Sequence, residues 1–212
     1  MQQGRTFLKK PQGNKCKTMK KLRFLSVIAV LMFCNCNIFA QKEHLKFSGI
    51  EIDGSITRFQ SKLISKGYVS YTDLNSKLPA GSRAFKGTFV NNKVLACVYY
   101  DESSKNVYKV KVVVEDLSED MAKQKLNEFR KLFNQKYEAY FIEDKDSFIL
   151  VQMRDVNLSD DVDKWKNSLG EIDVYIRKNE SLYNYPYHYS LHVDYTDQIN
   201  SEKHENSVIE DL

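Results

Sequence analysis

The side chains with the most regular spacing are four tyrosines near the end of the chain: Tyr183, Tyr185, Tyr187 and Tyr189. A period of two places side chains on one face of a β-strand. A tyrosine row suits recognition of a partner, because each ring buries a large area and keeps a polar hydroxyl. The alternative is that Tyr189 lines the core and the others form a loop, since Pro186 cannot donate a hydrogen bond inside a sheet.

The same segment carries three groups that bind metal ions in other proteins: His188, His192 and Asp194. Histidines four residues apart on a strand are separated by ~13 Å, too far to share one ion. His192 and Asp194 are closer together, but the sequence provides no evident third ligand. We therefore expect no metal ion and no cofactor.

An acidic segment that includes Asp155, Asp160, Asp161 and Asp163 raises the question of calcium. A calcium loop of the EF-hand type needs Gly at its sixth position and Glu at its twelfth. Counted from Asp155, those positions hold Asp160 and Lys166. We interpret the segment as a solvated loop.

Signatures of nucleophilic catalysis are missing from the sequence. It has no Gly-x-Ser-x-Gly elbow, no Gly-rich phosphate loop and no paired-histidine zinc motif. Cys97 lies in an apolar, strand-like run, which favours packing in the core, and His44 lies in a segment expected to be flexible. We predict that the protein is not an enzyme. The alternative is a hydrolase whose site assembles in space, for instance with His44 beside an acid.

The N-terminal segment predicts export. A basic start at Lys20, Lys21 and Arg23 precedes an apolar run from Phe24 to Phe33, with a small residue, Ala40, at the expected cut. The apolar run holds about 10 residues and a membrane-spanning helix needs about 20, so we expect no span. We predict a periplasmic or extracellular protein that begins at Gln41.

Two features of this leader have alternatives. Residues Met1 to Thr18 are polar and basic, so translation is predicted to start at Met19. A lipid anchor on Cys34 or Cys36 is the less favoured route, because the preceding residues, Phe33 and Asn35, are not small.

Removal of the leader changes the charge and the cysteine content. Eight of the 32 basic side chains and no acidic ones lie in residues 1–40, which leaves 24 basic against 28 acidic side chains, a net charge of −4. Nucleic-acid binding needs concentrated positive charge, so we exclude it. Only Cys97 of the four cysteines remains, which excludes a disulfide within the mature chain.

Hydrophobic periodicity predicts two helices and a set of antiparallel strands. The first helix runs from Ser55 to Gly67 and the second from 119 to 136, with Ala122, Leu126, Phe129, Leu132 and Phe133 as its apolar stripe. Strands are predicted at 83–90, 93–101, 107–115, 139–143, 148–153, 171–177 and 187–196, with a tight turn at Asn91-Asn92. The segment 45–52 alternates, and 201–212 reads as a frayed polar tail.

These elements predict an α+β fold made of two repeats, each a helix followed by an antiparallel meander. The leader covers 1–40, the repeats cover 41–116 and 117–200, and the tail covers 201–212. One face of the sheet is expected to be covered by the helices and the other to be wetter.

Nearly all of the mature chain resembles a family of uncharacterised secreted proteins from gut-dwelling Gram-negative bacteria. The resembling elements are the opening Leu45-x-Phe47-x-Gly49-Ile50-x-Ile52-Asp53-Gly54, the helix end Leu63-x3-Gly67-Tyr68 and the closing Asp194-Tyr195-x-Asp197-x2-Asn200. Such proteins are similar in arrangement to the β-lactamase-inhibitor-protein fold, a tandem helix-plus-four-strand repeat shared by small outer-membrane assembly lipoproteins. The resemblance implies a fold and an envelope location, and it implies no catalytic residues.

We therefore predict a secreted, non-catalytic binding module of the envelope that holds a protein or peptide partner through a sheet face or the tyrosine row. The alternatives are an outer-membrane assembly or scaffold protein, and the hydrolase named above. The sequence specifies neither the partner nor the oligomeric state.

Overall fold

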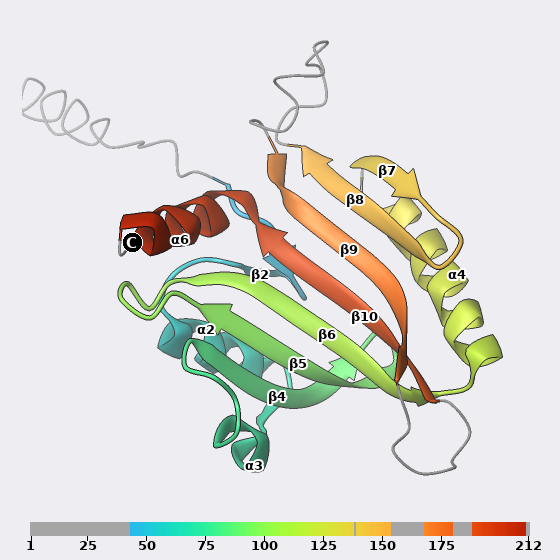
Figure 1. The fold of residues 1–212 in the computed structure, drawn as a ribbon, viewed down its shortest axis with the longest axis horizontal. Helices are drawn as coiled ribbons and strands as arrows, with labels where there is room; N and C mark the ends of the chain where they lie inside the picture. Colours follow the sequence, from blue (N-terminus) through green and yellow to red (C-terminus); the bar gives the residue numbers. More distant parts are fainter. Residues whose placement is uncertain (1–42, 138, 154–167, 180–187, 211–212) are drawn as a thin grey trace, which may run out of the picture. The chain divides into compact units, whose positions relative to one another are not determined.

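The computed structural model describes residues 43–137, 139–153, 168–179 and 188–210. These residues belong to one compact unit, Glu43–Leu212. The unit is an α+β structure in which helices pack on a large antiparallel sheet, as the sequence predicts (Figure 1). The predictions for Asp155–Asp163 and for the first three tyrosines of the row concern residues outside the described ranges.

The sheet has eight strands, and every pair of neighbours is antiparallel. The order is β3-β4-β5-β6-β10-β9-β8-β7. The strands are β3 (Val69–Ser70), β4 (Ser82–Phe89), β5 (Asn92–Tyr100), β6 (Val107–Leu117), β7 (Ala139–Glu143), β8 (Ser147–Met153), β9 (Ser168–Asn179) and β10 (His188–Asp197). The two meanders thus meet at β6 and β10, where Val112 lies opposite Val193.

Two amphipathic helices cover one face of this sheet (Figure 1). Helix α2 (Ile56–Ser65) buries Ile56, Phe59 and Leu63, and α4 (Glu119–Lys136) buries Ala122, Leu126, Phe129 and Phe133. Their N-caps are Ser55 and Ser118, whose hydroxyls accept the backbone N–H groups of Arg58 and Met121. Leu132 departs from the predicted apolar stripe, because its side chain is exposed.

The core lies between these helices and the strands. It includes Val98 on β5, Val110 and Val112 on β6, and Val193 and Tyr195 on β10. Since side chains alternate along a strand, the residues between these positions point to the opposite face. The two faces of the sheet therefore differ: one packs against the core and the other is open.

The opening segment forms a short hairpin that belongs to the core. β1 (Lys46–Phe47) pairs with β2 (Ile50–Glu51) across a turn at Ser48 and Gly49, both with positive φ. The ring of Phe47 contacts Tyr68 and Tyr195. A second tight turn joins β4 and β5, but its central residues are Val90 and Asn91, one position earlier than predicted.

The prediction of a frayed tail is wrong for residues 201–210. Helix α6 (Gln198–Glu210) follows β10 directly. Its N-terminal end is held by Asp197, whose carboxylate accepts the backbone N–H of Asn200 at 2.9 Å. The remaining described helix, α3 (Thr72–Asn75), is a single turn beside β4.

Candidate functional site

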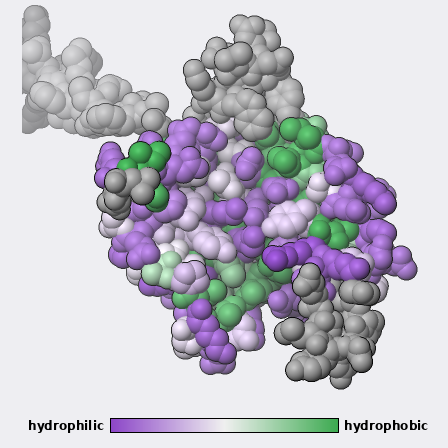
Figure 2. All heavy atoms as spheres, in the orientation of Figure 1, coloured by the Kyte–Doolittle hydropathy of each residue, from purple (hydrophilic) through white to green (hydrophobic). Residues whose placement is uncertain are grey.

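The surface of the sheet that faces away from α2 and α4 is called the open face below. It is formed by Leu95, Cys97 and Tyr99 on β5, Lys109, Lys111 and Val113 on β6, His192 and Asp194 on β10, Asp173 and Tyr175 on β9, and Ile149 on β8. Figure 2 shows hydrophobic patches on this side of the molecule, separated by a hydrophilic band.

One row of this face crosses four strands and carries a charged or polar side chain on each. Cys97 lies opposite Lys111, Lys111 opposite Asp194, and Asp194 opposite Asp173. The Asp194 Oδ2 atom lies 3.3 Å from the Lys111 Nζ and 3.0 Å from the Nζ of Lys109. The centre of the open face is therefore a partly covered network of opposite charges.

A neighbouring row is less polar and ends on an aromatic pair. Leu95 lies opposite Val113, and His192 lies opposite Tyr175. The rings of His192 and Tyr175 stack with centroids 5.0 Å apart. Lys111 connects the two rows, because its ammonium group donates to the Tyr175 hydroxyl at 3.1 Å.

Burial and neighbouring charges set the protonation of this face. Burial raises the pKa of the Cys97 thiol, so the thiol stays protonated. Burial, with the Lys111 charge adding to it, lowers the pKa of His192 to about 4. Burial also disfavours the charge on Lys111, but the bond to Tyr175 and the Asp194 carboxylate outweigh it and raise the pKa of Lys111. At neutral pH this face therefore presents a neutral imidazole, a neutral thiol and a protonated ammonium group.

Two buried polar atoms of the open face have no hydrogen-bond partner among the described residues: His192 Nδ1 and Asp194 Oδ1. Beside them, burial and the charge of Asp194 raise the pKa of Asp173. Such atoms are uncommon in folded proteins.

A hollow of the open face lies where β5 and β6 diverge. It has a volume of about 410 Å³ and is lined by Tyr71, Lys86, Gly87, Lys93, Val94, Leu95, Val113, Glu115 and Asp116. Its floor is apolar, because Leu95 is half-buried and Val113 is 8 % exposed. Below, this hollow is called the β5–β6 cleft.

The tyrosine row is only partly described. Tyr189 packs against the core, and its hydroxyl donates to the Glu119 Oε2 atom at 3.0 Å. Tyr183, Tyr185 and Tyr187 lie outside the described residues, so their role in binding stays a prediction. His188 is described only in its backbone, and no group of three metal-binding side chains occurs in the described ranges.

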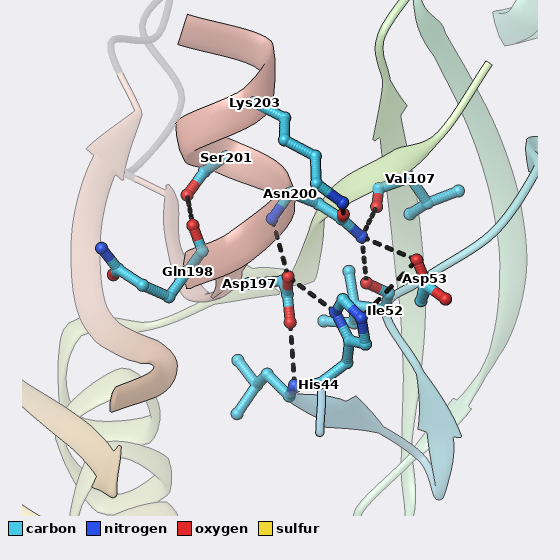
Figure 3. Close-up of polar contacts among 10 residues, drawn as sticks. His44, Ile52, Asp53, Val107, Asp197, Gln198, Asn200, Ser201 and Lys203 are labelled. Carbon is cyan, nitrogen blue, oxygen red and sulfur yellow. Dashed lines mark hydrogen bonds and ion pairs between the residues drawn. The ribbon is translucent and has the colours of Figure 1, made fainter. Parts of the chain in front are cut away.

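A second polar cluster joins the two ends of the described chain (Figure 3). The carboxylate of Asp197 accepts the backbone N–H of Leu45 at 2.9 Å and lies 3.0 Å from the Nδ1 atom of His44. The side-chain amide of Asn200 donates to Ile52 O, Val107 O and the Asp53 carboxylate at 3.0–3.1 Å. Below, this cluster is called the terminal clasp.

His44 was expected to be flexible, and that expectation is wrong: its side chain is 8 % exposed. The hydrogen bond to Asp197 raises its pKa against the effect of burial. Its Nε2 atom lies 3.8 Å from the Asp53 carboxylate. Both ring nitrogens thus face carboxylates.

A third polar cluster attaches the middle of α6 to the loop between β5 and β6. Asp101 accepts hydrogen bonds from Ser103, Ser104 and Ser207, and its Oδ2 atom lies 3.0 Å from His204 Nδ1. The bonds from Ser103 and Ser104 hold the pKa of Asp101 far below its ordinary range. The His204 ring stacks on Tyr108 with centroids 4.2 Å apart. These contacts fix α6 in place.

Comparison with protein families, curated proteins and solved structures gives no match to this chain. Among the described helices, none combines the length and apolar character of a transmembrane segment.

Only some residues of the open face are predicted by the sequence. The spacing of His192 and Asp194 predicts a shared face, and in the structure both lie on the open face, where Asp194 pairs with Lys109 and Lys111. Lys111 and Tyr175 were not singled out, because they come from strands 64 residues apart. The alternation of Lys109 and Lys111 with buried valines was the available signal.

Proposed function

We propose that this chain is a secreted, non-catalytic binding module of the cell envelope that recognises a protein or peptide partner through the open face. The observation that carries the proposal is the β5–β6 cleft, which combines an apolar floor with exposed charged side chains on a wide sheet surface. Interaction sites typically combine an apolar centre with a polar rim.

The sheet order supports a tandem repeat, which also belongs to this proposal. The last strands of the two meanders, β6 and β10, lie side by side, and the strand order runs outward in the same sequence from both. A repeat of this kind doubles the width of one continuous surface. This strand order supports the proposal of a β-lactamase-inhibitor-like arrangement.

Site-specific photocrosslinking tests the surface. A benzophenone amino acid is placed at Tyr99 or Leu95 on the open face, and at Ser61 or Met121 on α2 and α4 as matched controls on the covered side. The mature protein is irradiated in envelope extract from the native host. We expect one discrete crosslinked partner from the open-face positions only. Equal crosslinking from the helix positions, or crosslinks from those positions alone, would show that the surface is misassigned.

A further inference from the structure

The β5–β6 cleft has a specific geometric cause. The ladder between the two strands runs from the pair Tyr100 and Val107 to the pair Leu95 and Val113, and pairing stops there. Beyond it, Asp116 has a φ of 57°. The ladder between β6 and β10 also shifts register nearby. β6 therefore bends away from β5, as strands do at bulges, and the cleft opens between them.

The floor of the cleft comes from β5 and β6, and one wall comes from β4. Leu95 and Val113 lie opposite each other at the point where the strands part. Gly87 on β4 also lines the cleft. A side chain at Gly87 would collide with Tyr68, since an added Cβ atom would lie 2.2 Å from the ring. Gly87 is thus packed closely against Tyr68 on the core side of the sheet.

The rim carries opposite charges on its two sides. Lys86 and Lys93 stand on the side of β4 and β5, and Glu115 and Asp116 stand on the side of β6. All four side chains are exposed, and none of them forms an ion pair with a described residue. Lys86 is held in place because its Nζ atom lies 3.5 Å from the centre of the Tyr71 ring.

The backbone of β5 beside the cleft can pair with a further strand. Beyond Leu95, the edge of β5 that faces β6 has no strand paired with it among the described residues. An extended peptide satisfies such groups by main-chain hydrogen bonds, and pockets between the strands then select its side chains.

We propose that the β5–β6 cleft binds an extended peptide segment in which an apolar residue lies between an acidic and a basic residue. The apolar side chain rests on Leu95 and Val113, the acid pairs with the lysines, and the base pairs with Glu115 and Asp116. The inference rests on the proposed function, because it names the kind of partner that the open face accepts.

The test uses four labelled peptides whose central triplets are Asp-Leu-Lys, Lys-Leu-Asp, Asp-Leu-Asp and Lys-Leu-Lys in the same Gly-Ser frame. Binding to the mature protein is measured by fluorescence anisotropy at low salt. Exposed ion pairs each contribute little, so we expect the mixed-charge peptides to bind roughly three- to tenfold more tightly than the like-charged ones. High salt should remove the preference.

A charge-reversed cleft gives the decisive comparison. The double variant Glu115→Lys and Asp116→Lys makes the whole rim basic, so it should prefer Asp-Leu-Asp. The matched control, Glu128→Lys with Glu205→Lys, makes the same change of net charge on exposed positions of α4 and α6 and should keep the original ranking. Leu95→Ser, checked for an unchanged melting curve, should weaken all four peptides.

Three results would overturn the inference: no binding by any of the four peptides, a ranking that the Glu115 and Asp116 reversal leaves unchanged, or the same shift in the control. If the open-face photocrosslinks persist in that case, the charge pattern is wrong and the binding function stands. If the crosslinks also fail to appear on the open face, both proposals fall.

Discussion

The Nδ1 atom of His44 lies 3.0 Å from the Oδ1 atom of Asp197, although 153 residues separate them in the chain. Asp197 is fully buried, and its carboxylate also receives the backbone N–H groups of Leu45 and Asn200. The first described strand, the end of β10 and the start of α6 therefore share one acceptor. The stability of the fold should depend on this acceptor more than on any exposed ion pair.

Removal of the Asp197 carboxylate should be strongly destabilising. Asp197→Ala leaves the donors of His44, Leu45 and Asn200 without an acceptor in a buried place, which costs about 3–5 kcal/mol of unfolding free energy. Urea denaturation of the mature protein measures the change. Asp120→Ala, at an exposed position of α4, is the matched control and should change the stability by less than about 1 kcal/mol. Equal effects from the two substitutions would contradict the role assigned to Asp197.

His44 should make the protein less stable as the pH rises above neutral. Its folded pKa lies above the unfolded value of 6.5, because Asp197 favours the charged imidazole. The stabilisation is complete below pH 6.5 and disappears as the pH rises through the raised pKa. Unfolding free energies between pH 6 and 9 should decline for the natural protein and stay flatter for His44→Gln. An identical slope in both proteins would rule out His44 as the source.

His192 should make the protein less stable as the pH falls below 6.5. The pKa of His192 is about 4 in the folded protein and 6.5 in the unfolded chain. Between these pH values His192 is therefore protonated mainly in the unfolded chain. Stability should fall as the pH drops from 6.5 to 4, by roughly 3 kcal/mol at ~1.36 kcal/mol per pKa unit. His192→Gln should remove most of this loss, and titration of the His192 ring by NMR checks the pKa directly. A ring that titrates near 6.5 in the folded protein would refute the prediction.

The first half of α6 should be essential and its last turn dispensable. A chain that ends at Asp197 loses the Asn200 amide that binds Ile52 and Val107, together with the contacts of His204 and Ser207 to Asp101. We expect it not to fold. A chain that ends at Ser207 keeps all of these contacts, and the described residues that it loses, 208–210, are exposed, so it should fold with stability within about 1 kcal/mol of the full chain. Near-UV circular dichroism and urea titration distinguish the two outcomes.

Local signals made most of the fold predictable. Ser55 caps α2 and Ser118 caps α4, and in both helices the apolar residues recur with helical spacing. The strands of the meanders alternate in the same way, as with Val110 and Val112 against Lys109 and Lys111. These patterns act over a few residues, so a single sequence contains them completely.

The features that could not be predicted depend on distant partners. His44 follows the charged residues Lys42 and Glu43, and nothing local in the sequence indicates its buried contact with Asp197. Helix α6 has only Ile199 and Asn200 buried, so its apolar periodicity is weak. The available signal was Asp197 three residues before Asn200, a helix N-cap spacing. The β5–β6 cleft arises from a bend in β6, and the alternation of residues does not record such a bend.

The terminal clasp also limits the order in which the parts of this protein can fold. His44 and Leu45 precede every described strand of the sheet in the chain, and their acceptor, Asp197, is the last residue of β10. Until Asp197 has been synthesised, the opening segment cannot complete its contacts with the sheet, and contacts between residues so distant in sequence form slowly. The export proposed above would require the chain to cross a membrane in an extended form. Because the contact of His44 depends on a residue 153 positions later, the opening segment stays open while the strands between them are made.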